Sequence, residues 1–171
     1  MKRLPLLVTG VSVLALALPV ADRHPLFVWN ATASVPTGLY RVVVREPYRD
    51  SLALIRLPEP FRTFSHVREY VPASALVIKP IAALRGDTLC RHGNVVSINR
   101  RPVAVARKLD AADRPLPRWH GCRQLGVTAV AVISRPADSF DSRYFGPLDR
   151  GHVVGLVIPV WTNTHLPTRP H

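Results

Sequence analysis

One lysine of this chain stands where its amine could act as a base. The chain has 23 lysines and arginines, of which only Lys2, Lys79 and Lys108 are lysines. Lys79 alone lies inside an apolar run, at 75–84. Arginine keeps its proton at any useful pH, whereas a lysine amine removed from water loses its charge more easily. Lys79 is therefore a candidate general base. The alternative is an edge-strand lysine with a packed stem and a hydrated head.

The candidate nucleophile is Ser34, within the segment 32–40. Pro36 restricts Val35 toward extended geometry, and Gly38 permits a turn. A serine on such a rigid, irregular stretch presents its hydroxyl and its own backbone N–H in a fixed direction. From this segment alone an ordinary turn serine is the simpler interpretation. Together with Lys79, however, the segment predicts a Ser–Lys dyad, in which a neutral amine removes the hydroxyl proton.

A third segment, 138–146, holds polar residues that could support such a dyad. Asp141 and Arg143 would lie on one side of an extended chain and could form an ion pair. Ser139 and Ser142 offer hydroxyls that could orient an amine. The alternative is a polar loop with an incidental ion pair.

The elements that must position these residues are mainly short strands. The 171 residues suffice for one domain with a core, and the 17 prolines disfavour long helices. Apolar, β-branched runs predict strands, and residues 99–102 predict a hairpin turn. We expect a short helix at 61–70 and an exposed loop at 110–118. The predicted strands cover residues 39–44, 52–57, 75–81, 95–98, 103–106, 128–134 and 153–160. The body is therefore predicted to be mostly β.

The amino-terminal segment predicts a membrane anchor. Residues 4–20 carry no charge and follow Lys2 and Arg3, which favours an amino terminus in the cytoplasm. Trp29 would suit the headgroup boundary. We therefore expect a cytoplasmic tip at 1–3, one transmembrane helix within an anchor at 4–28, a β-rich body outside the membrane at 29–162, and a flexible tail at 163–171. A cleaved signal peptide is the alternative, because small residues occur near the end of the run.

Charge and cysteine content exclude several classes of protein. The net charge is +12, but the arginines are scattered and no basic stripe alternates with aromatic residues, so we predict no nucleic-acid partner. A basic surface facing anionic lipid explains the charge better. Two cysteines, without ligand-spaced histidines, predict no metal site, and nothing indicates a cofactor. Cys90 and Cys122 would form a disulfide in an exported domain, with two buried thiols as the alternative.

Three segments follow the predicted anchor and resemble, in their order along the chain, three sequence boxes of the bacterial type I signal peptidase family. Residues 34–40 resemble its nucleophile box, 79–87 the box with the catalytic lysine, and 139–146 its carboxyl-terminal box. The Gly-Leu-Tyr that ends the first box, at 38–40, resembles the form of this box in the TraF-type peptidases of conjugative transfer. Pro80, where ordinary signal peptidases carry a basic residue, and Arg85, in place of a proline, also point toward that branch. The resemblance implies a signal-peptidase-like, β-rich catalytic body with an apolar surface on the membrane.

The resemblance implies a role for each matching position. Ser34 would attack the scissile carbonyl and Lys79 would be the general base. The oxyanion would be held by the Thr32 hydroxyl and the Ser34 N–H, and Ser139 would position the amine.

In the same resemblance Asp141 and Arg143 form a supporting ion pair near the site. The resemblance to the conjugative branch also implies that this aspartate is important for activity.

These observations predict a membrane-bound serine endopeptidase at the bacterial inner membrane, with its catalytic domain in the periplasm. Its expected partners are an exported precursor protein or a pilin propeptide, inner-membrane lipid and other conjugative transfer proteins. An acyl-enzyme would end in hydrolysis or cyclisation. One alternative is a non-catalytic periplasmic assembly factor that binds precursor peptides by β-addition. Another is a soluble, self-cleaving Ser–Lys protein of the repressor type, which the uncharged amino-terminal run disfavours.

Overall fold

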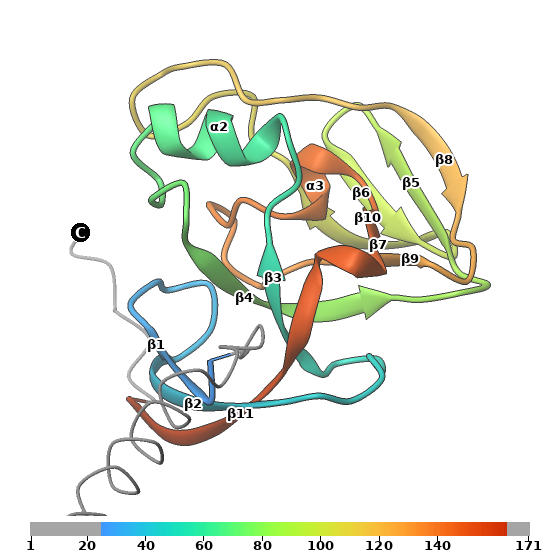
Figure 1. Cartoon of the computed structure of the whole chain (residues 1–171). Coiled ribbons are helices and arrows are strands. Elements are labelled where there is room, and N and C mark those ends of the chain that lie inside the picture. The colour runs from blue at the N-terminus through green and yellow to red at the C-terminus, as the bar shows by residue number, and fades with distance from the viewer. Residues whose placement is uncertain (1–24, 164–171) are drawn as a thin grey trace, which may run out of the picture.

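Two antiparallel β-sheets form the body of the protein (Figure 1). The structure is a computed structural model and describes residues 25–163. The larger sheet has the strand order β1-β2-β11-β3-β4-β9-β10, and the smaller one has the order β7-β6-β5-β8. The mostly β fold expected from the sequence is therefore confirmed.

The strands of the larger sheet are β1 (Phe27–Asn30), β2 (Thr37–Val43), β3 (Leu52–Arg56), β4 (Leu76–Ala83), β9 (Ala129–Val132), β10 (Leu148–Asp149) and β11 (Val153–Asn163). Those of the smaller sheet are β5 (Thr88–His92), β6 (Val95–Ile98), β7 (Arg101–Val105) and β8 (Gly121–Gln124). The helices are α2 (Phe61–Val67), α3 (Ser142–Phe145) and the 3-10 helix η1 (Arg150–His152).

All seven strands predicted from apolar, β-branched runs are present, with ends displaced by a few residues. The short helix expected at 61–70 is α2, and the turn expected at 99–102 joins β6 to β7. Strands β5 and β8 were not predicted, because each contains charged or polar residues, and β8 has no buried residue. The helix α3 and the two-residue strand β10 are too short to leave a periodic pattern in the sequence.

The predicted anchor lies mainly outside the described residues. Phe27 and Val28, at the end of the range 4–28, belong to strand β1 and pair with β2. No helix within residues 25–163 has the length and apolar character needed to cross a membrane. Of the predicted tail, Asn163 ends β11 and the remainder also lies outside the described residues.

The central strands of the larger sheet carry apolar side chains on both faces. In β3, Ala53 and Ile55 pack into one core cluster, whereas Leu54 packs into another. In β4, Val77 and Ile81 join the first cluster and Ile78 joins the second. Because side chains alternate along a strand, Lys79 faces the same side as Val77 and Ile81. Lys79 therefore lies inside the core, in a strand whose other residues are all apolar.

Gly38 allows the first hairpin to lie against β11. Its φ is +143°, and a Cβ at this position would lie 2.2 Å from the carbonyl oxygen of Trp161. Only glycine fits both the backbone conformation and the space. Strand β2 therefore packs closely between β1 and β11, and the loop 31–36 is held at the end of the β1–β2 hairpin.

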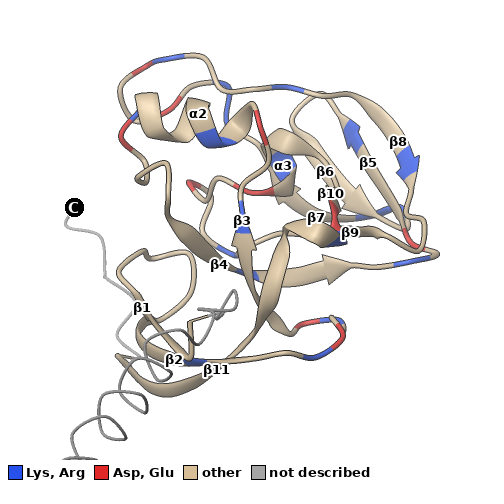
Figure 2. Ribbon diagram, in the orientation of Figure 1, with Lys and Arg blue, Asp and Glu red and all other residues tan. Residues whose placement is uncertain are grey.

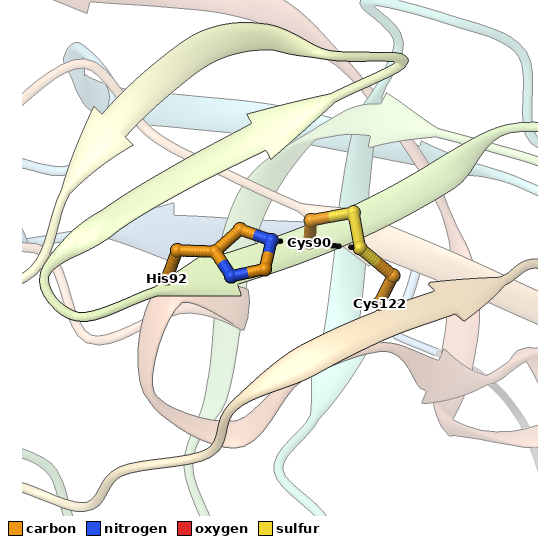
Figure 3. A group of neighbouring side chains, drawn as sticks. All are labelled: Cys90, His92 and Cys122. Carbon is orange, nitrogen blue, oxygen red and sulfur yellow. Dashed lines mark hydrogen bonds between the residues drawn. A yellow bond between two sulfur atoms is a disulfide. The ribbon is translucent and has the colours of Figure 1, made fainter.

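The smaller sheet has its own core and a covalent link. Leu89, Val96 and Ile98 are buried between this sheet and β9 of the larger one. Cys90 and Cys122 are paired directly across β5 and β8, and their sulfurs are bonded (Figure 3). Basic residues are spread over both sheets and the loops between them (Figure 2).

Candidate active site

The amine of Lys79 lies between two serine hydroxyls. Its Nζ donates a hydrogen bond of 2.6 Å to the Oγ of Ser34 and one of 2.7 Å to the Oγ of Ser139. The two hydroxyl oxygens are 3.3 Å apart. Lys79 is only 4 % exposed, so water does not replace these contacts. Ser34, Lys79 and Ser139 come from three distant parts of the chain, and all three were candidate site residues in the sequence. They therefore meet at one point.

Burial changes the protonation of Lys79. It lowers the pKa of the amine from 10.5 to about 8, because a charged amine is poorly stabilised away from water. The nearby charges are smaller influences on this pKa: Asp141 and Asp138 raise it, whereas Arg143 lowers it. At neutral pH roughly a tenth of the amine is uncharged. Lys79 thus has both the position and the protonation required of a general base.

Ser34 lies in the loop between β1 and β2. Val35, the next residue, is 7 % exposed and packs with Tyr40 in a core cluster. The Tyr40 hydroxyl donates a 2.6 Å hydrogen bond to the carbonyl of Pro36. The chain that follows Ser34 is thus fixed, and Ser34 itself remains half-buried at the edge of a cavity.

Thr32 also lies at this cavity, but its hydroxyl is engaged elsewhere. It donates a 2.9 Å hydrogen bond to the Oδ1 of Asn30, and the Thr32 N–H donates to the same oxygen at 3.1 Å. Sequence reasoning did not identify Asn30, which is 5 % exposed at the end of β1. The available signal was an asparagine two residues before a threonine, a spacing at which the side chain can accept from the following backbone.

The predicted pair of Asp141 and Arg143 is present and buried. Nε of Arg143 donates to Oδ1 of Asp141 at 2.8 Å, and the two side chains are almost inaccessible to water. Asp141 also accepts the N–H of Ser134 at 2.9 Å and caps helix α3. Arg143 in turn donates to the carbonyls of Ser134 and Ala137. The pair therefore closes the loop 134–141, which carries Ser139.

The two serines of this segment have different partners. Ser139 contacts the Lys79 amine, as described above. The Ser142 hydroxyl, which the sequence also offered as an orienting group, instead accepts the N–H of Val132 at 2.9 Å. Ser142 therefore fixes α3 against β9 rather than touching the amine.

Two residues of the second sheet and its flanking loop support α3, and sequence reasoning missed both. Arg91 is fully buried and donates through NH1 to the carbonyl of Arg143. Trp119 donates through Nε1 to the carbonyl of Ser142 at 3.1 Å. In this four-residue helix the Ser142 carbonyl also accepts the N–H of Gly146, whereas Arg91 supplies a side-chain donor to the Arg143 carbonyl. Neither contact has a local sequence signature.

A cavity of about 350 Å³ adjoins Ser34, Lys79 and Ser139. The two tyrosines in its wall have hydroxyls that are already engaged: Tyr70 donates to Asp110, and Tyr144 accepts the N–H of Arg107. The wall therefore presents mainly apolar groups. They include Leu57, Val71, Val77, Leu116, Phe140 and Tyr144. Such a cavity suits apolar side chains of an extended peptide.

The disulfide lies beside an exposed histidine (Figure 3). Nε2 of His92 is 3.7 Å from Sγ of Cys122, and these atoms form a compact group with Cys90. Cysteine binds metals as a thiolate, and a sulfur bonded to another sulfur has no thiolate to offer. In its oxidised form this group therefore links two strands and does not offer a thiolate metal site.

Comparison with known proteins agrees with this arrangement. A family model described as signal peptidase, peptidase S26, matches residues 2–162. A plasmid transfer protein TraF of Escherichia coli is 30% identical over 145 residues, covering 78% of this chain and 81% of that protein. A conjugal transfer protein TraF of Agrobacterium fabrum is 30% identical over 148 residues, with the same coverage of each chain.

Among solved structures, a signal peptidase I of Enterococcus faecalis matches 67% of this chain and 98% of its own, at 17% identity. The TM-score of this match is 0.39. The family model and the sequence relatives are sufficient by themselves: the chain belongs to the peptidase S26 signal peptidase family.

Proposed function

We propose that this protein is a serine endopeptidase of conjugative transfer, with Ser34 as nucleophile and Lys79 as general base. The observation that carries the proposal is the 2.6 Å contact between the buried Lys79 amine and the Ser34 hydroxyl. Membership of the S26 family supports peptidase chemistry, and the relatives named for plasmid and conjugal transfer support the biological setting.

In the proposed reaction the neutral Lys79 amine takes the Ser34 proton while Oγ attacks the scissile carbonyl carbon. The resulting ammonium gives this proton to the leaving amine nitrogen as the C–N bond breaks. An ester between Ser34 and the acyl half of the substrate remains. The Ser139 hydroxyl, 2.7 Å from Nζ, keeps the amine directed at Ser34 through both proton transfers.

The tetrahedral oxyanion needs donors fixed before the reaction begins. The Ser34 N–H is one, and the Thr32 hydroxyl is the second. One such donor is typically worth about 3–4 kcal/mol of barrier. Asp141 and Arg143 touch neither the substrate nor the Lys79 amine in this scheme, and they support the site by closing the Ser139 loop.

The acyl-enzyme can react further in two ways. Water, deprotonated by Lys79, would release a carboxylic acid, whereas an amine of the substrate itself would form a new amide and close a ring. An exported precursor, most simply a pilin subunit, is the proposed substrate, because the relatives are transfer proteins and signal peptidases act on exported chains. Other conjugative transfer proteins are proposed partners.

The proposed location is the inner membrane, with the catalytic body in the periplasm. The support comes from the uncharged run at 4–20 and from exposed aromatic residues near the start of the body. Trp29 and Trp161 stack with ring centres 5.8 Å apart, and both are more than half exposed. Paired, exposed tryptophans suit a membrane–water boundary.

Co-expression of candidate pilin precursors with the wild type, Ser34→Ala and Lys79→Arg tests the proposal. Mass spectrometry should show processed product with the wild type alone. A cyclic product would be lighter by one water than the hydrolysed one. Unprocessed precursor that still co-purifies with all three forms would refute catalysis and favour an assembly factor that binds by β-addition.

A further inference from the structure

The buried side chain of Asn30 contacts the nucleophile turn at five points. Its Nδ2 donates to the carbonyls of Thr32 at 2.9 Å, Val35 at 3.1 Å and Pro36 at 3.0 Å. Its Oδ1 accepts the N–H and the hydroxyl of Thr32, at 3.1 Å and 2.9 Å. One side chain therefore contacts both sides of the loop that carries Ser34.

The geometry requires an asparagine here. The acceptor contacts form a turn that aspartate or serine could also make, but the carbonyls of Thr32 and Val35 need a donor at the other end of the same short side chain, and its two protons supply them. The Pro36 carbonyl lies within reach of the same amide and also accepts the Tyr40 hydroxyl. Those carbonyls lie in a tight turn, and buried backbone groups need hydrogen-bond partners. Asn30 is also paired with Gly38 across β1 and β2, so its backbone is fixed by the sheet. The Asn30 side-chain amide therefore links the backbone of the β1–β2 hairpin to the turn that carries Ser34.

We propose that Asn30 is the positioning residue of the nucleophile turn, an inference that rests on the proposed roles of Ser34 and Thr32. It fixes the direction of the Ser34 N–H and hydroxyl. It also holds the only proton of the Thr32 hydroxyl until an oxyanion forms. That proton must then turn from Oδ1 of Asn30 to the oxyanion, while the Thr32 N–H stays bonded to Oδ1 and keeps the backbone in place.

The test measures acylation of the purified full-length protein by the p-nitrophenyl ester of acetyl-alanine. The burst amplitude counts reactive Ser34 per folded molecule, and the burst rate reports acylation. Asn30→Ala should lower the burst rate about tenfold to a hundredfold, because small misplacements of reacting groups are costly. Tyr40→Phe is the matched control, since it removes a donor from the same Pro36 carbonyl without touching Thr32. Its loss should be much smaller.

A double-mutant cycle distinguishes positioning from general weakening of the fold. Thr32→Val should lower the burst rate by about 10²–10³, as expected for an oxyanion donor. If Asn30 acts partly through Thr32, Asn30→Ala should cost less in the Thr32→Val background than in the wild type. If the two substitutions lower the burst rate independently, so that their fold-decreases multiply in the double variant, the inference is overturned. Should Asn30→Ala fail to fold, Asn30→Ser retains an acceptor for the Thr32 N–H and is used in the same cycle.

A readout independent of activity completes the test. The amide hydrogen of Thr32 should exchange faster with solvent in Asn30→Ala than in Tyr40→Phe. No burst in the wild type, or a burst that persists in Ser34→Ala, would defeat the proposed function and this inference with it. A burst that depends on Ser34, but is as fast in Asn30→Ala as in Tyr40→Phe, would overturn the inference alone.

Discussion

Replacing Lys79 by methionine should make the folded protein more stable near neutral pH while abolishing the proposed catalysis. The reason is the cost of burying an amine that still binds a proton. The amine has a pKa of about 8 in the folded protein and 10.5 as its ordinary value. At about 1.4 kcal/mol for each pH unit, this difference corresponds to about 3 kcal/mol. Methionine has a similar shape and carries no charge.

Lost hydrogen bonds reduce the expected gain. The methionine makes no bond to Ser34 or Ser139, and each such bond contributes about 1 kcal/mol. The two hydroxyls are 3.3 Å apart, so they can hydrogen-bond to one another once the amine is gone. The expected net increase in the free energy of unfolding is therefore about 1–3 kcal/mol near neutral pH.

The pH dependence gives the sharper test. From about pH 8 to about pH 10.5 the unfolded chain binds one more proton at this lysine than the folded protein does. The wild type should therefore gain stability from this group as pH rises through that window, and below it the full cost applies. Urea denaturation of both proteins at several pH values measures the difference. The advantage of Lys79→Met should shrink as pH rises.

Lys108→Met is the matched control, because Lys108 is an exposed lysine and its loss should change stability little at any pH. The reasoning is refuted if Lys79→Met is no more stable than the wild type near neutral pH. It is also refuted if the difference between the two proteins stays constant from about pH 8 to about pH 10.5.

Three further perturbations follow from the described contacts. Because catalysis should require neutral Lys79, kcat/KM should rise with pH and level off above a midpoint near 8. Asp138→Asn should move this midpoint to lower pH, since the Asp138 charge raises the pKa of Lys79. A pH–rate profile of ester or peptide cleavage measures both. Gly38→Ala should cost several kcal/mol in urea denaturation, because a Cβ would lie 2.2 Å from a β11 carbonyl oxygen; unchanged stability would contradict the close approach. Replacing Cys90 and Cys122 by serine should lower the free energy of unfolding by about 3–4 kcal/mol, as expected for a bridge that spans 32 residues.

The sequence predicted which residues meet at the site better than it predicted all of their supports. Lys79 could be identified because a lysine within an apolar run must either reach water or lose its charge. The structure decides between the two, since Lys79 lies in the interior strand β4 and is only 4 % exposed. The proximity of Lys79 to Ser34, 45 residues away, has no local signal. This proximity could be predicted only from the order of the three boxes, which is a property of the family and not of either segment alone.

Secondary structure was predictable where one property repeats along the chain. The apolar run of β4 is such a case, and so is the β-branched run that became β11. Strands β5 and β8 contain charged and polar residues and no apolar run, and they pair with each other across about 30 residues of sequence. The disulfide between them was predicted only for an exported domain, because two cysteines alone do not show whether the protein is in an oxidising compartment.

Two supports, Arg91 and Asn30, could not be predicted because their partners are backbone carbonyls. Arg91 bonds to three carbonyls, and it is buried without an acidic partner among residues 25–163. Asn30 likewise bonds to three carbonyls. A carbonyl is present at every residue, so a sequence cannot mark which one needs a donor. That need arises only where chain geometry leaves a carbonyl unpaired and away from water, as in a four-residue helix or a tight turn. Ionisable side chains can therefore point to a reaction in advance, whereas a supporting residue that bonds only to backbone carbonyls becomes evident only with the fold.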